Sequence, residues 1–186
     1  MQMDDMILVS VDDHVCEPPD MWQRHVPGQW KERAPRFVTR QDGTNLWVFE
    51  GQLRPGCFDV DARIEDMNVN GVLGSLCFPT VPGFVGELFG RAAAAGNGEL
   101  AITMLRAYND WHVDDWCGRH PGRFIPLAIP PIWDPEEMGR EVRRVARKGC
   151  HAVTFADNPG GLGYPSLHDA HWDPFWKACA DEGTIV

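Results

Sequence analysis

Short apolar runs, several of them rich in β-branched residues, recur along the chain at intervals that suit buried strands. They lie at residues 7–11, 72–78, 124–129, 150–155 and 184–186, the last being only the start of a strand. The first run, Ile-Leu-Val-Ser-Val, shows no clean alternation of apolar and polar positions, which is typical of a strand buried on both faces. The pattern predicts the strands of a parallel sheet.

Helical periodicity fills most of the intervals between these runs. The predicted helices cover about residues 60–70, 100–119, 134–148 and 172–180. In the first of them Val60, Ile64 and Met67 repeat at the i, i+4, i+7 spacing, and Gly71 is a typical helix end before the next strand.

The helix at 134–148 has the clearest boundary signals. Asp134 is a favoured N-cap residue, Pro135 suits the first helical position, and Glu137 has the spacing of a capping box. Basic residues at 143–148 complement the helix dipole, so we interpret that cluster as structural.

Two stretches break the alternation. Residues 16–35 carry several prolines and no clear period, so we expect a long ordered loop. Asp42-Gly43 separates two β-prone runs, which predicts a β-hairpin inserted at about residues 36–50.

Strands that alternate with helices indicate an α/β fold with a parallel sheet. An open doubly wound sheet and a closed (β/α)8 barrel of the TIM type both satisfy the order. No GxGxxG or GxxxxGK loop is found, which favours the barrel. A full barrel takes about 250 residues, so the chain accounts for only about the first four βα units plus the hairpin.

Charge and cysteine content narrow the function classes. Lys plus Arg number 17 and Asp plus Glu number 27, giving a formal net charge of −10, which argues against nucleic acid as a partner. The six cysteines form no Cys-x-x-Cys pair, and residues 1–5 lack the start of a signal peptide. No apolar stretch reaches the roughly 20 residues needed to cross a bilayer. We expect a cytoplasmic protein with reduced thiols and no membrane partner.

Candidate chemistry lies at the end of the first strand. Side chains two residues apart point to the same side of a strand, so Asp12 and His14 are expected to project together and Asp13 oppositely. A carboxylate beside an imidazole at the carboxyl edge of a parallel sheet could begin a Zn²⁺ or Mn²⁺ site. The alternative is structural, with an aspartate capping the next turn and His14 a satisfied polar residue.

Residues 7–15, followed by Glu17-Pro18-Pro19-Asp20-Met21-Trp22, resemble the opening of the amidohydrolase-related family, in the branch of aminocarboxymuconate-semialdehyde and resorcylate-type decarboxylases. Further matching stretches are Asp66-Met67 with Gly71-Val72, residues 107–111, residues 121–127, and His168-Asp169 with His171-Trp172-Asp173-Pro174. The resemblance covers nearly the whole chain.

The resemblance implies that Asp12 and His14 bind a divalent metal, zinc first and manganese second. It places the third ligand, a His, after strand five and a catalytic Asp after strand eight, both beyond Val186. Residues 1–186 are thus expected to be the N-terminal part of a single barrel domain.

The implied activity is non-oxidative decarboxylation of a small carboxylic acid. Two alternatives stay open: metal-dependent hydrolysis of an ester, amide or lactone, and a catalytically incomplete half-barrel that associates with another chain. We expect a homo-oligomer, because an open sheet edge needs a partner.

Two further groups of polar residues could contact a ligand. Asp157 follows a strand and is a candidate for substrate contact, or for a turn beside Pro159. His168, Asp169 and His171 are interpreted as loop anchors rather than as ligands.

Overall fold

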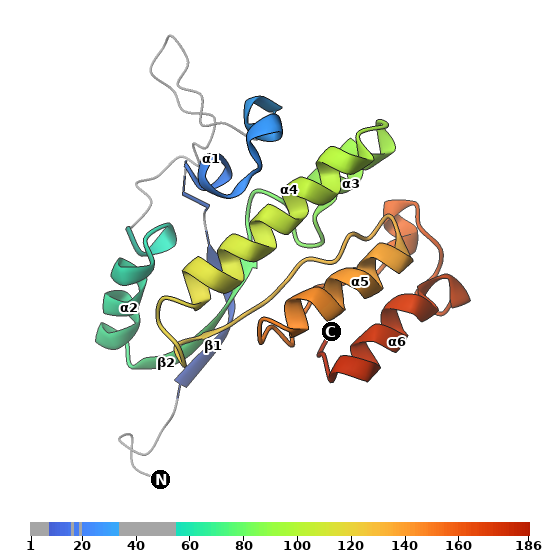
Figure 1. Ribbon diagram of the computed structural model, residues 1–186. Helices are drawn as coiled ribbons and strands as arrows, with labels where there is room; N and C mark the ends of the chain where they lie inside the picture. Colours follow the sequence, from blue (N-terminus) through green and yellow to red (C-terminus); the bar gives the residue numbers. More distant parts are fainter. Residues whose placement is uncertain (1–7, 16, 19, 34–54) are drawn as a thin grey trace.

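Parallel strands in sequence order form the framework (Figure 1). The computed structural model describes residues 8–15, 17–18, 20–33 and 55–186. Within them β1 (Leu8–Val15), β2 (Val72–Pro79) and β3 (Phe124–Ile125) pair in the order β1-β2-β3, all parallel. Parallel bridges join Ala128 to Val153 and Ala152 to Ile185, so the order continues through five segments. The predicted parallel α/β arrangement is confirmed.

The third to fifth segments are less regular than predicted. The strand expected at 124–129 is reduced to two residues and one bridge, and the run at 150–155 to bridges at Ala152 and Val153. Pro126 has no N–H to donate to a ladder, which limits regular pairing in the third segment.

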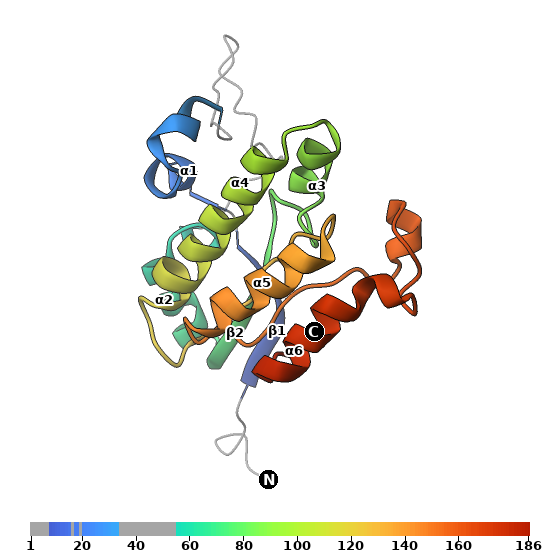
Figure 2. The ribbon, with the colours of Figure 1, turned by 45° about the vertical axis from the view of Figure 1, so that its right-hand side comes forward.

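Helices follow the strands, and all but α3 lie in the predicted places. They are α2 (Val60–Val69), α3 (Glu87–Ala94), α4 (Gly98–Asp110), the π-helical η4 (Trp111–Cys117), α5 (Pro135–Ala146) and α6 (Asp173–Glu182). Helix α4 crosses the strands in Figure 1, and Figure 2 shows α5 lying beside α4. Helix α3 was not predicted.

The Asp134 cap is confirmed. Its carboxylate accepts hydrogen bonds from the backbone N–H groups of Glu136 (3.0 Å) and Glu137 (3.1 Å). The capping box itself is wrong, because the Asp134 N–H donates to Pro131 and the Glu137 carboxylate pairs with Arg106 and Arg140.

The predicted loop at 16–35 contains helix, which corrects that expectation. Helix α1 (Met21–His25) and the 3-10 helix η2 (Gly28–Arg33) lie within it. The predicted hairpin at about 36–50 lies outside the described residues. The remaining 3-10 helices are η3 (Pro55–Cys57), η5 (Pro159–Leu162) and η6 (Ala170–Trp172).

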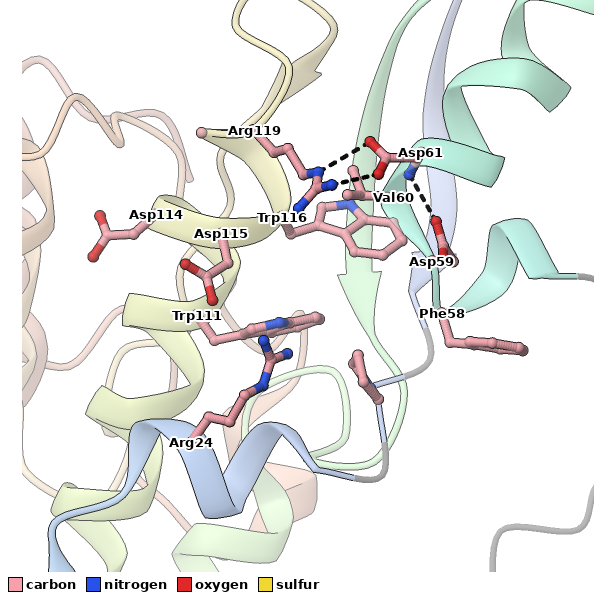
Figure 3. A pocket seen from close by; sticks show the side chains of 12 residues that line it. Arg24, Phe58, Asp59, Val60, Asp61, Trp111, Asp114, Asp115, Trp116 and Arg119 are labelled. Carbon is pink, nitrogen blue, oxygen red and sulfur yellow. Dashed lines mark hydrogen bonds and ion pairs between the residues drawn. The ribbon is translucent and has the colours of Figure 1, made fainter.

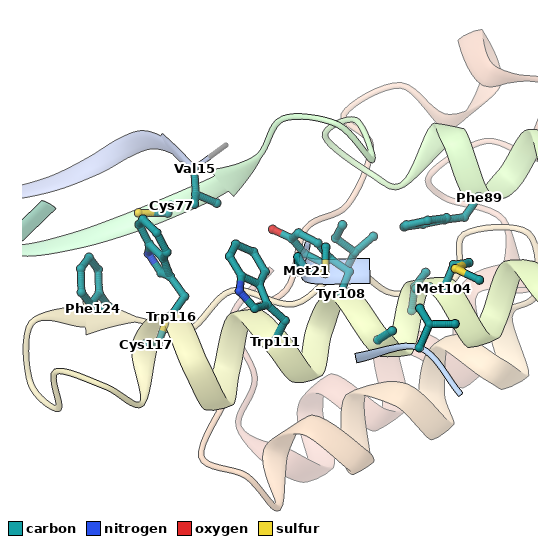
Figure 4. Close-up of a cluster of buried hydrophobic side chains, with 14 of the residues drawn as sticks. Val15, Met21, Cys77, Phe89, Met104, Tyr108, Trp111, Trp116, Cys117 and Phe124 are labelled. Atoms are coloured by element: carbon teal, nitrogen blue, oxygen red, sulfur yellow. The ribbon is translucent and has the colours of Figure 1, made fainter. Parts of the chain in front are cut away.

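Two clusters of buried apolar side chains form the core. The first lies between the strands and α4 and includes Cys77, Tyr108, Trp111, Trp116 and Phe124 (Figure 4). The second joins α5 and α6 around a fully buried tryptophan, Trp172. The five described cysteines are all unpaired, and none of the described helices is long and apolar enough to cross a membrane.

Candidate functional site

The carboxyl edge of β1 presents His14. Its side chain is exposed, and its ring lies 6.0 Å from that of Phe78, which it faces across the β1–β2 ladder. Asp13 has different surroundings, because its carboxylate accepts a hydrogen bond from the hydroxyl of the fully buried Ser75. Asp13 and His14 therefore contact different sides of the sheet, as strand alternation predicts.

The register of β1 shifts just before these residues. Ser10 pairs with Ser75 and Asp13 with Cys77, so three steps along β1 match two along β2. One extra residue in a strand is a β-bulge, a feature that re-aims neighbouring side chains. Asp12 lies in this interval and its side chain is outside the described part, so the shared face of Asp12 and His14 stays a prediction.

Glu17 is a buried carboxyl group that the sequence reasoning did not single out. Its side chain accepts backbone N–H hydrogen bonds from Thr80 (3.4 Å) and Val81 (3.2 Å), just beyond the end of β2. Burial raises the pKa of this carboxyl to about 7, although these hydrogen bonds to the carboxylate oppose the rise. Nothing in the spacing of charged residues distinguishes it from an exposed loop carboxylate.

Asp157 is exposed and follows the bridged segment around Val153, so it lies at the same edge of the parallel segments as the end of β1. Its neighbour Asn158, not Asp157, accepts the Gly161 N–H that caps η5. The turn interpretation therefore applies to Asn158, and a substrate role for Asp157 stays a prediction.

The His168 to His171 segment serves as an anchor, as interpreted. The Asp169 carboxylate caps η6 by accepting the His171 N–H at 2.8 Å. The His171 ring packs edge-on against Trp172 at 4.7 Å.

The His14 imidazole at the end of β1 is a type of side chain that binds divalent metals. No described residue hydrogen-bonds the His14 ring, and imidazole nitrogen is a preferred ligand of zinc. Among the described residues no group of three or more His, Cys, Asp or Glu side chains could hold a metal ion. These residues therefore supply part of a ligand set.

A cavity of about 680 Å³ lies elsewhere, between α1, the start of α2 and η4 (Figure 3). Its charged groups are largely paired: Asp61 contacts Arg119 at 2.6 Å and His120 at 2.7 Å, and these hydrogen bonds lower the pKa of the Asp61 carboxyl. Neither His14 nor Asp157 lines it.

Five parallel segments with helices against one face are the arrangement found in part of a (β/α) barrel, and His14 at their carboxyl edge is a candidate metal ligand. The chain belongs to the amidohydrolase family, whose model matches residues 14–186.

Relatives agree with this assignment. The chain is 34% identical over 113 residues to 2-amino-3-carboxymuconate-6-semialdehyde decarboxylase of Caenorhabditis elegans, a match that covers 57% of this chain and 26% of that protein. It therefore spans about a quarter of the length of that relative.

Similar solved structures show the same fold. An amidohydrolase from Mycobacterium avium subsp. paratuberculosis K-10 superposes with a TM-score of 0.71 at 22% identity, covering 97% of this chain and 58% of that one. A 2,6-dihydroxybenzoate decarboxylase complexed with 2,6-dihydroxybenzoate gives 0.58 at 20% identity, covering 96% and 48%. The chain thus spans about half of these structures.

Proposed function

We propose that residues 1–186 are the N-terminal part of one barrel domain of a metal-dependent carboxy-lyase that acts on a small carboxylic acid. The observation that carries the proposal is His14, exposed at the carboxyl edge of the first of five parallel segments. Family membership and the decarboxylases among the relatives support it. The share of each similar structure that is covered supports a barrel completed outside these residues.

In this proposal Asp12 and His14 hold the metal, with Zn²⁺ preferred and Mn²⁺ second. When bound, the metal would stabilise developing negative charge and orient a substrate carboxylate or hydroxyl.

Phe78 and Phe84 stack with ring centroids 4.8 Å apart next to His14. This apolar surface suits an unsaturated or aromatic acid and would exclude water from one side of it. Asp157 carries a negative charge, so it would accept a hydrogen bond from a substrate hydroxyl rather than contact the substrate carboxylate.

Metal content of the protein expressed from its complete gene tests the proposal. Wild type is expected to hold Zn²⁺ or Mn²⁺ stoichiometrically, and both Asp12→Ala and His14→Ala to lose it. Two exposed residues outside the proposed ligand pair, His168 and Glu65, provide the matched controls His168→Ala and Glu65→Ala, which should stay loaded. Stoichiometric metal in both Asp12→Ala and His14→Ala would show that the ligands lie elsewhere.

Hydrolysis is the second candidate, favoured by the family description and by the amidohydrolase among the similar structures. Release of CO₂ from a panel of aromatic and unsaturated acids, compared with cleavage of esters, amides and lactones, separates the two activities. Cleavage without CO₂ release would favour the hydrolase.

A further inference from the structure

We propose that Arg63 is a positioning residue that fixes the backbone of His14 for metal binding. The inference rests on the proposed function and extends it to a residue of α2.

The guanidinium of Arg63 joins three parts of the chain. Its Nη2 donates to the backbone carbonyl of His14 at 2.8 Å, and its Nε donates to that of Gly56 at 2.7 Å. Its Nη1 lies 3.7 Å from the Asp13 carboxylate, which also accepts the Ser75 hydroxyl. One side chain therefore links η3 and α2 to the end of β1.

This contact is suited to arginine and buried enough to be specific. The Arg63 side chain is 15% exposed and that of Asp13 24%, so the ion pair offsets part of the cost of burying both charges. A planar guanidinium presents several N–H donors in a fixed geometry, whereas a lysine ammonium cannot reproduce the fork.

Gly56 lets η3 approach α2 closely enough for this arrangement. A Cβ atom at position 56 would lie 3.2 Å from the Arg63 Cα and 2.5 Å from an Asp66 carboxylate oxygen. A side chain there would push η3 away from the guanidinium.

The carbonyl of His14 belongs to the peptide unit that follows its Cα, so holding this oxygen restrains the direction of the imidazole. The ladder with β2 restrains the same residue from the other side. Partners that orient metal ligands typically contribute about 10–100-fold to metal affinity. Because Arg63 acts through the backbone, we expect its loss to weaken Zn²⁺ binding about tenfold.

Arg123 provides a matched control at the opposite end of β2. Its guanidinium also bonds two backbone carbonyls, those of Leu73 (2.8 Å) and Val72 (3.1 Å), and one side-chain oxygen, that of Asn68 (2.9 Å). Arg63→Met and Arg123→Met therefore remove similar hydrogen bonds, but only the first removes a contact to His14.

The test is Zn²⁺ affinity by chelator competition in the complete protein, together with amide hydrogen exchange at residues 13–15. Arg63→Met should weaken Zn²⁺ binding about tenfold and speed this exchange at least severalfold, while Arg123→Met changes neither. If Arg63→Met cannot be purified, Arg63→Lys takes its place with the same direction expected.

The outcomes distinguish failure of the proposed function from failure of the inference about Arg63. If wild type binds no Zn²⁺ through His14, the proposed function fails, and the exchange measurement still decides whether Arg63 restrains the strand end. Unchanged exchange at residues 13–15, or equal Zn²⁺ affinity in Arg63→Met and a wild type that binds through His14, would overturn the inference about Arg63.

Discussion

The carboxyl group of Glu17 is held against the chain that follows β2, where its ionisation depends on the fold. In the folded state its pKa is about 7, compared with 4.5 for the ordinary group. Between these values the folded protein keeps a proton that the unfolded chain loses. The free energy of unfolding should therefore fall by on the order of 3 kcal/mol as pH rises from about 4.5 to 7. It should keep this lower value at higher pH.

The Glu17→Gln variant tests this prediction, because an amide resembles the protonated carboxyl and does not ionise. Its urea midpoint should stay level between pH 4.5 and pH 8, whereas the wild-type midpoint falls; the amide NH2 cannot accept one of the two backbone N–H groups, so the comparison is of pH dependence and not of absolute stability. Glu99→Gln, at an exposed position, is the control and should track wild type. Identical pH profiles for wild type and Glu17→Gln would contradict the prediction.

Asn109 is a second residue whose substitution should have a large effect on the stability of the protein. Its fully buried amide accepts the Ile129 N–H at 2.9 Å, and donates to the Ile129 carbonyl at 2.9 Å and to Glu141 at 2.8 Å. Asn109→Ala leaves the buried N–H and carbonyl of Ile129 unpaired, whereas Glu141 keeps Arg144, and should lower the free energy of unfolding by about 3 kcal/mol. Asn70→Ala, which removes an exposed hydrogen bond to Asp66, should cost less than about 0.5 kcal/mol. Equal urea midpoints for the two variants would refute this account.

At single residues, local chemistry was predictable and long-range contact was not. The Asp134 cap depends on residues two and three positions away, and the sequence shows it. Glu17 accepts hydrogen bonds from backbone groups 63 and 64 residues away in the sequence. Arg63 donates a hydrogen bond to a backbone carbonyl 49 residues away. Partners at that distance are set by the packing of strands, which one sequence does not display.

Among the elements, the helix predicted at 100–119 shows why a regular period can mislead. It divides into α4 and the π-helical η4, and Trp111, His112 and Val113 are all buried. Three consecutive buried residues do not fit one face of a regular helix. The wider π turn places all three side chains in the interior, which a regular helical period does not predict.

The packing of α5 against α6 depends on Gly139. A Cβ atom there would lie 2.9 Å from the Pro174 carbonyl oxygen and 3.5 Å from the Ala178 Cβ. Gly139→Ala should separate the two helices and destabilise the protein by about 1–3 kcal/mol, despite the better helix propensity of alanine. Gly98→Ala has open space at its Cβ position and should be neutral or mildly stabilising. Thermal unfolding of both variants decides the matter, and a stabilised Gly139→Ala would be the contrary result.

At the scale of the molecule, the parallel segments are open at both ends of their order. Within the described residues β1 and the segment at Ile185 each pair on one side only, and Ile185 is 73% exposed. We propose that such edges favour association with a further copy when the 186-residue chain is alone.

Ile185→Lys should shift the 186-residue chain toward monomer in sedimentation velocity, because a charged side chain opposes edge pairing. Val69→Lys, at an exposed position at the end of α2, should leave the distribution unchanged. A wild-type chain that is monomeric at high micromolar concentration would contradict the prediction.

The order of the strands follows from the alternation of strand and helix, which is why the fold class was predictable from residues 60–186. The candidate site was less predictable from the sequence. The expectation that Asp12 and His14 share one face assumes a regular β1, whereas the observed register contains an extra residue.

That extra residue divides β1 into two stretches, residues 8–10 and residues 13–15, with different roles. Residues 8–10 pair with the first half of β2, and residues 13–15 place His14 at the carboxyl edge of the sheet, where a ligand would bind. We expect a substitution within residues 8–10 to disturb His14 less than one within residues 13–15, because the irregular step lies between them. Deletion of a single residue at positions 11–12 would remove that step and leave a regular ladder there, so a shift of residues 8–10 would pass directly to His14.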